Sequence, residues 1–178
     1  MPLLLTASII PDIDLILRFL AHRGPTHSLI TIIALSLPFL ILYRKAAVPY
    51  SIALASHSLI GDFITDGVQL FWPISAQTYG ILNISVMSLT NALLELTLFF
   101  ASTSIMVWKS DLRKIVSDKH KIALIIPIGA VLGPMLAVGR GSELSLPILL
   151  IIPSLFYLAI FAYSLWVSAR KSLKISRI

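Results

Sequence analysis

The sequence predicts an all-α, polytopic transmembrane helix bundle of about five spans with a short N-terminal segment. Three observations carry this prediction. Hydrophobic residues make up 57% of the 178 residues, charged residues only 12%, and the mean hydropathy is +0.94. Apolar runs approach the roughly 20 residues that a helix needs to cross a bilayer. Basic residues gather between these runs. Soluble domains carry about 25% charged residues, so the composition argues against a soluble enzyme or a disordered chain.

Five apolar runs are expected to span the membrane: residues 26–43, 50–66, 86–108, 122–138 and 146–167. The second and fourth are short, and the second has polar residues inside it. The opening Met1–Ile10 is apolar but too short to cross alone, and it is consistent with the end of a span that begins upstream. We expect one integral membrane domain over 1–178, with a metal-site half at 8–75 and a helical scaffold at 86–178.

The basic residues predict the orientation. Eleven of the 14 fall in alternate connections, and the positive-inside rule makes those connections cytoplasmic: Arg44, Lys45, Lys109, Arg113, Lys114, Lys119, Lys121, Arg170, Lys171, Lys174 and Arg177. Only Arg18, Arg23 and Arg140 fall on the other side. This predicts a protein of the cytoplasmic (inner) membrane with a cytoplasmic C-terminus. The lipid bilayer is the expected partner and nucleic acid is not, while the oligomeric state stays open.

Two motifs precede or open the first span. Asp12 and Asp14 follow Pro11, and on an extended backbone both carboxylates would face one cation; the alternative is an Asp that caps a helix. Residues 22–28 run His-Arg-Gly-Pro-Thr-His-Ser. Pro25 is expected at the first helical position, which puts His27 in the first turn of the span and His22 on a loop above it. Two interfacial histidines and a snorkelling arginine are the alternative.

The second span carries His57, Asp62 and Asp66, and ionisable residues inside a span are costly and usually functional. Asp62 and Asp66 are four apart and share a helix face. His57 and Asp62 are five apart, so a regular helix would aim them about 140° apart. A π-bulge at Gly61 would bring them together. The alternatives are that Asp62 and Asp66 carry the site while His57 only packs, or that the polar residues hold helices together.

The predicted metal ligands share one side of the membrane and offer only nitrogen and oxygen: Asp12, Asp14, His22, His27, His57 and Asp62. Such donors suit a divalent ion, zinc first and otherwise manganese, magnesium or iron, and one or two ions would fit. The chain has no cysteine, so thiolate sites and disulfides are excluded. Asp66 is the candidate base or a further ligand. Arg23 is the candidate holder of an anionic group, because its guanidinium donates paired hydrogen bonds.

Three polar residues lie further along the chain. Asn91 and Glu95 stand one helical turn apart within the third span and are either functional or structural. His120 lies in a basic loop, where a solvated side chain is expected.

These motifs, in this order, resemble the YdjM family, described as membrane-bound, metal-dependent hydrolases, some under LexA control. The family pattern is PDxD, then HRGxTHS, then a span with His, Asp and Thr followed by a G-V-x-L-x-W-P-like stretch. This chain has Pro11–Asp14, His22–Ser28, then His57, Asp62 and Thr65, and continues Gly-Val-Gln-Leu-Phe-Trp-Pro over 67–73. The resemblance covers residues 8–75 and implies a metal-dependent hydrolase.

The chain departs from the family pattern in two places. The family commonly spaces the helical His and Asp four apart, whereas His57 and Asp62 are five apart. Its members also usually begin with a further span ahead of the PDxD.

Two functions follow as hypotheses. The first is a hydrolase at the extracytoplasmic face that acts on a lipid or phosphate ester. The second is a non-enzymatic transporter or metal-handling protein, whose polar residues would form a path across the bilayer. The polar residues gather at one depth, and only Asn91 and Glu95 would extend such a path. A structural or assembly partner would leave the gathered donors unexplained.

Overall fold

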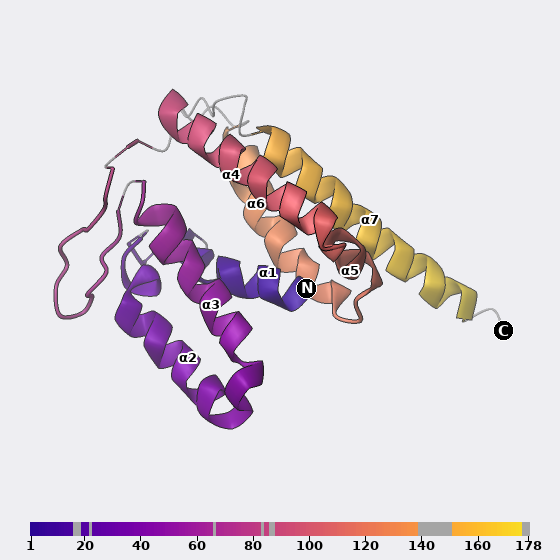
Figure 1. Cartoon of the computed structure of the whole chain (residues 1–178), viewed down its shortest axis with the longest axis horizontal. Helices are drawn as coiled ribbons and strands as arrows, with labels where there is room; N and C mark the ends of the chain where they lie inside the picture. Colours follow the sequence, from indigo (N-terminus) through magenta and orange to yellow (C-terminus); the bar gives the residue numbers. More distant parts are fainter. Residues whose placement is uncertain are drawn as a thin grey trace. The chain divides into compact units, whose positions relative to one another are not determined.

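A computed structural model describes residues 1–15, 19–21, 23–65, 67–82, 84–85, 88–138 and 151–175 (Figure 1). Every regular element within these residues is a helix, and one isolated β-bridge joins Val68 to Tyr79. The chain divides into two compact units, one over Leu4–Val86 and the other over Met87–Ile178 with Met1–Leu3. The all-α prediction is confirmed for the described residues.

The first unit is built from short helices. It holds most of α1 (Pro2–Ile9), the 3-10 helices η1 (Ile10–Leu15) and η2 (Pro25–His27), α2 (Leu29–Tyr43), the turn η3 (Arg44–Ala46), α3 (Val48–Ser56) and the π-helix η4 (His57–Asp62). The turn η3 reverses the chain, so α2 and α3 pack side by side as a hairpin (Figure 1). The helix η1 packs against η2. This brings the first motif beside the second.

The helix α2 begins three residues later than the sequence predicts. Ser28 has an extended backbone, and its hydroxyl accepts a hydrogen bond from the Thr31 N–H at 3.1 Å, which makes Ser28 the N-cap. Pro25 opens the separate 3-10 turn η2, with His27 at its end. The prediction that His27 lies in the first turn of the span is therefore wrong. His27 lies just before the span, where the backbone can turn its side chain back toward η1.

The loop after η4 covers the start of α2. The Leu29 N–H donates to the carbonyl of Leu70 at 2.9 Å, and the Ser28 hydroxyl donates to the carbonyl of Trp72 at 2.9 Å. Val68 is fully buried. Gly67 has φ +91°, and a Cβ there would lie 2.9 Å from the Tyr79 carbonyl oxygen, so only glycine fits this turn. The Gly-Val-x-Leu-x-Trp stretch thus satisfies backbone groups at the beginning of a candidate span.

The second unit packs longer helices: α4 (Leu89–Trp108), α5 (Asp111–Ser117), η5 (Lys121–Leu124), α6 (Ile125–Val138) and α7 (Ile151–Ile175). The Phe99 ring on α4 meets those of Phe156 and Tyr157 on α7, with centroids 5.4 and 5.7 Å apart. The buried Ser164 hydroxyl on α7 donates to the Ile115 carbonyl on α5 at 3.0 Å. These contacts tie α4 and α5 to α7.

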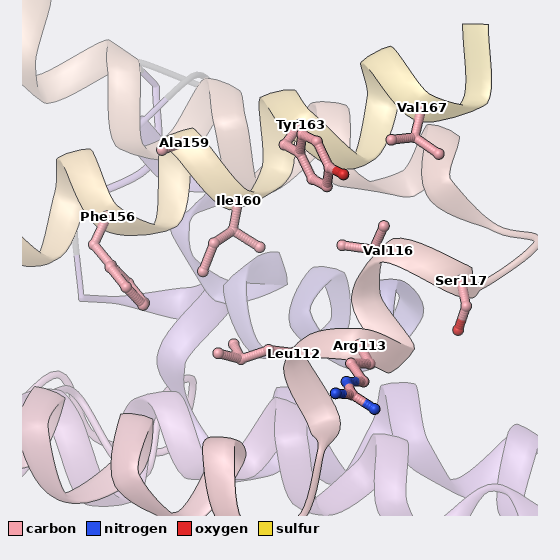
Figure 2. A pocket seen from close by; sticks show the side chains of 9 residues that line it. All are labelled: Leu112, Arg113, Val116, Ser117, Phe156, Ala159, Ile160, Tyr163 and Val167. Atoms are coloured by element: carbon pink, nitrogen blue, oxygen red, sulfur yellow. The ribbon is translucent and has the colours of Figure 1, made fainter. Parts of the chain in front are cut away.

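An apolar groove of about 660 Å³ runs between α5 and α7, lined mostly by side chains such as Leu112, Val116 and Ile160 (Figure 2). Its lining includes one charged residue, Arg113, and no acidic residue or histidine. The groove therefore lacks the donor set of the predicted metal site.

Three described helices are long and apolar enough to cross a membrane: Leu29–Ala46, Leu89–Trp108 and Ile151–Arg170. The other two predicted spans fall on α3 with η4 and on α6, which are shorter. The described residues thus confirm a membrane-type helical protein but not the count of five spans. Large side chains such as Phe39, Leu42 and Trp108 are more than half exposed, as lipid-facing residues are. The orientation stays a prediction.

Candidate metal centre

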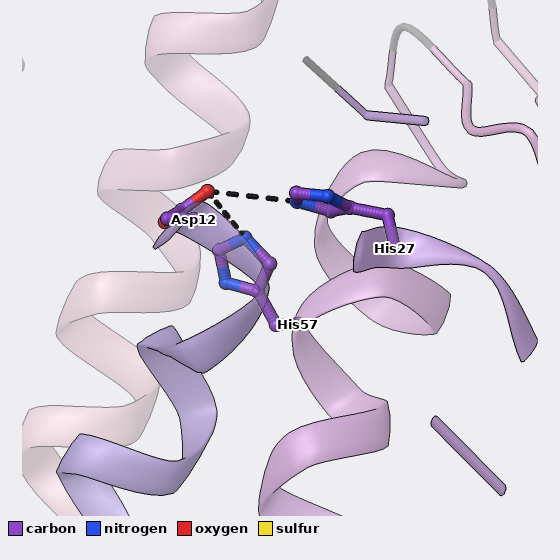
Figure 3. A group of neighbouring side chains, drawn as sticks. All are labelled: Asp12, His27 and His57. Carbon is purple, nitrogen blue, oxygen red and sulfur yellow. Dashed lines mark hydrogen bonds and ion pairs between the residues drawn. The ribbon is translucent and has the colours of Figure 1, made fainter. Parts of the chain in front are cut away.

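Four predicted ligands converge in the first unit. Asp12 comes from η1, His27 from η2, and His57 and Asp62 from the two ends of η4. Asp12 Oδ1 lies 3.1 Å from His57 Nε2 and 3.5 Å from His27 Nε2 (Figure 3). Asp62 Oδ2 lies 3.3 Å from His27 Nε2 and 3.4 Å from His57 Nε2. Each carboxylate oxygen therefore faces both imidazole nitrogens.

These separations match those between neighbouring ligands of one ion. Ligands bonded at about 2.0–2.2 Å to a common metal lie about 2.8–3.6 Å apart, for bond angles between 90° and tetrahedral. All four nitrogen–oxygen distances, 3.1–3.5 Å, fall within that range. One ligand atom from each of Asp12, His27 and His57 also lies within 4.8 Å of the other two. The buried Asp62 Oδ2 accepts no hydrogen bond from the described residues. Asp12, His27 and His57 thus form a group with the spacing of metal ligands, and Asp62 lies beside both imidazoles.

The π-helix explains how His57 and Asp62 face one point. The Phe63 N–H donates to the Ser58 carbonyl, five residues back, at 3.0 Å, which is the π pattern. The predicted distortion near Gly61 is confirmed, since η4 covers His57–Asp62. A Cβ added at Gly61 would meet no atom within 4 Å. The distortion therefore does not depend on close packing at this glycine.

Asp14 lies on the opposite edge of the His27 ring from Asp12. The segment is a 3-10 helix and not extended, so Asp12 and Asp14 point in different directions. Asp14 Oδ2 is 3.3 Å from His27 Nδ1, whereas Asp12 approaches Nε2. The expectation that both carboxylates face one cation from an extended backbone is wrong. Asp14 instead contacts Nδ1, the His27 nitrogen that faces away from Asp12 and Asp62.

Arg23 is held close to the site. Its Nε lies 3.1 Å from Asp62 Oδ1, and its side chain is 16% exposed. Its backbone has φ 60°, an uncommon conformation for a non-glycine residue. Its carbonyl accepts from Gln69 N–H at 3.0 Å. At the next residue, Gly24, a Cβ would lie 2.8 Å from the Ala21 carbonyl oxygen. Close packing of this turn therefore positions the guanidinium.

The other predicted residues are not part of the described cluster formed by Asp12, His27, His57 and Asp62. His22 and Asp66 lie outside the described residues. Asn91 donates to Glu95 at 2.7 Å along α4, as expected for a helical pair. His120 is exposed and contacts Asp118, which agrees with a solvated side chain. Thr26, whose hydroxyl contacts both Asp14 and His27, was not predicted; its signal is its position directly before His27.

The cluster has an excess of acidic groups and is partly open to solvent. Burial raises the pKa of Asp12, but hydrogen bonds from His27 and His57 and their charge outweigh it and hold that pKa below its usual range. With neutral imidazoles, Asp12, Asp14 and Asp62 exceed Arg23 by two negative charges, which a divalent ion or two extra protons would balance. The His57 side chain is 25% exposed and that of His27 is fully buried. The cluster is thus reachable from the His57 side.

A chain with membrane-length apolar helices and this cluster is an integral membrane protein with a possible metal-binding group. Residues 1–140 match the family described as YdjM inner membrane protein, and the chain belongs to that family. This match confirms the resemblance seen in the motifs and extends it beyond residues 8–75. No curated protein and no solved structure matches the chain.

Proposed function

We propose that this chain is a membrane-bound, metal-dependent hydrolase whose ion is held by Asp12, His27, His57 and Asp62. The observation that carries the proposal is that each of two carboxylate oxygens lies 3.1–3.5 Å from both imidazole Nε2 atoms. Zinc suits these donors best, and manganese and magnesium are the alternatives. A divalent ion held there would supply Lewis acidity to polarise a scissile bond.

The chain's own residues would bind and orient the substrate. Arg23 would hold an anionic group of the substrate, since guanidinium groups recognise phosphate and carboxylate through paired hydrogen bonds. Its Nε contact with Asp62 ties that anion site to the ligand set. Asp66 is proposed as the general base and His22 as a further ligand. The part-exposed His57 side of the cluster would admit water and substrate.

The substrate proposed is a lipid or a phosphate ester at the extracytoplasmic face. His27 lies two residues before the first residue of α2, which coincides with a candidate span. We therefore propose that the cluster lies at the end of a span, near the lipid headgroups. The proposed face is supported by the positive-inside rule, which predicts that the opposite end of α2, with Arg44 and Lys45, is cytoplasmic.

Metal analysis combined with hydrolysis assays tests the proposal. Protein purified in detergent without chelators should hold about one divalent ion per chain, because a preformed donor set binds metal once its ligands are deprotonated. Asp12→Asn and His57→Ala should lose metal and hydrolysis together. His120→Ala is the matched control, since His120 is an exposed histidine outside the cluster, and it should keep both.

The outcomes separate the hypotheses. Metal near zero in the unmodified protein would refute the site and leave a cluster of ion pairs held by protonated histidines. Bound metal without hydrolysis of any lipid or phosphate ester, together with metal uptake into proteoliposomes, would favour the transporter or metal-handling alternative. Metal loss in His120→Ala as large as in His57→Ala would show that the loss is not specific to the cluster.

A further inference from the structure

The His27 ring is lined by oxygen acceptors on both edges. Its Nε2 faces Asp12 Oδ1 at 3.5 Å and Asp62 Oδ2 at 3.3 Å. Its Nδ1 lies 3.3 Å from Asp14 Oδ2 and 3.0 Å from the Thr26 hydroxyl oxygen. The ring is fully buried and the Asp14 residue is 3% exposed. Water therefore has little access to the Nδ1 edge of the ring.

The Thr26 hydroxyl determines which nitrogen carries the proton. A hydroxyl has one proton to donate, and Thr26 donates it to Asp14 Oδ2 at 3.0 Å. Thr26 must therefore accept from His27, which requires a proton on Nδ1. The Asp14 carboxylate favours the same proton position. In a neutral ring, the Nε2 lone pair then points at the Asp12 and Asp62 oxygens, an arrangement that a cation between them would stabilise.

Asp14 is itself fixed in place. The Arg23 backbone N–H donates to Asp14 Oδ2 at 3.1 Å, so the turn that carries Arg23 also holds this carboxylate. Metal-bound histidines commonly donate their second N–H to a carboxylate, which fixes the ring orientation and the tautomer. The Asp14 environment has this form, whereas Nδ1 of His57 forms no hydrogen bond or ion pair with any of the described residues.

We propose that Asp14, together with the Thr26 hydroxyl, is a positioning device that holds His27 as the Nδ1–H tautomer with Nε2 presented to the metal. The inference rests on the proposed metal site and deepens it. It assigns Asp14 a role distinct from that of Asp12: Asp12 binds the ion and Asp14 orients a ligand. Loss of such a partner typically lowers metal affinity about 10–100-fold.

The test is metal affinity at equilibrium, measured with zinc and a competing chromophoric chelator on the purified full-length protein. Asp14→Asn should bind zinc about 10–100-fold more weakly while the stoichiometry at saturating zinc stays that of the unmodified protein. Thr26→Val, which removes the hydroxyl, should also weaken binding. Thr26→Ser restores a hydroxyl at the same place and should restore the affinity. Cobalt in place of zinc should give a changed absorption spectrum in Asp14→Asn, because the His27 ring is reoriented.

Each outcome bears on one claim. If the unmodified protein binds no zinc, the proposed function fails. If it binds zinc and Asp14→Asn and Thr26→Val bind as tightly, only the positioning role fails. If Asp14→Asn has no site even at saturating zinc yet remains folded by circular dichroism, Asp14 is a direct ligand and the inference is overturned. If Asp14→Asn does not fold, the Thr26→Val and Thr26→Ser pair decides: equal affinity in the two would overturn the inference.

Discussion

Deletion of Gly61 tests whether the π-helix brings His57 and Asp62 to one centre. Successive residues of an α-helix are about 100° apart, so a five-residue spacing leaves the two side chains about 140° apart and a four-residue spacing about 40°. The Phe63–Ser58 hydrogen bond spans five residues. Removing one residue should convert this turn into a regular α-turn without changing the direction of the segments on either side. His57 and Asp62 should then stay on one face of the helix. Zinc affinity should stay within about tenfold, or roughly 1.4 kcal/mol.

Two controls define the comparison. Deletion of Ile52 removes a side chain that is 63% exposed from the regular part of α3. This deletion should turn His57 by about 100° relative to the residues before it. Zinc affinity should then fall by more than the roughly 100-fold expected when an orienting residue is lost. Gly61→Ala should bind zinc normally, since its Cβ meets nothing within 4 Å. Zinc affinity is measured by chelator competition. Equal loss in the Gly61 and Ile52 deletions would refute the π-helix argument.

The helix caps, a close-packed glycine and the topology are testable in the same way. Ser28→Ala should lower the unfolding free energy by about 0.5–2 kcal/mol and also weaken zinc binding, whereas the matched N-cap change Ser88→Ala should affect only stability in thermal melts. Gly24→Ala should cost about 1–3 kcal/mol, since its Cβ would be crowded; an unchanged melting temperature would show that the turn has room. A cysteine at Ser117 should resist an impermeant thiol reagent in intact cells and one at Ala76 should react, and the reverse pattern would invert the topology.

Much of the candidate site is predictable because the chain has few ionisable residues. In an apolar chain, each ionisable residue outside the basic clusters is conspicuous, so His27, His57, Asp12 and Asp62 could be chosen without a structure. The five-residue spacing of His57 and Asp62 fits one site only if the helix is distorted, and the π-helix is present. Here the hypothesis of a shared site predicted the distortion of the helix.

The arrangement around His27 was not predictable from spacing alone. Whether Pro25 opens α2 or a separate turn depends on Ser28, which satisfies Thr31 N–H and reaches the Trp72 carbonyl 44 residues away. The opposite directions of Asp12 and Asp14 likewise depend on a 3-10 conformation, while the sequence pattern allowed an extended one. Contacts between distant segments determine both features. The helix lengths differ from those predicted for the same reason, because an apolar composition does not determine the residue at which a helix ends.

The backbone departs from the α-helix at every described residue of the metal centre. Asp12 lies on a 3-10 helix, His27 on a 3-10 turn, and His57 and Asp62 on a π-helix. On a regular apolar helix, polar side chains spaced along the sequence would be spread around the axis and some would face lipid, where an unsatisfied polar group costs several kcal/mol. Irregular turns allow side chains from three short segments to point inward and satisfy each other. Substitutions that impose a regular α-helix on η1 or η2 should therefore be more damaging to the centre than changes on the lipid-facing surfaces of α2.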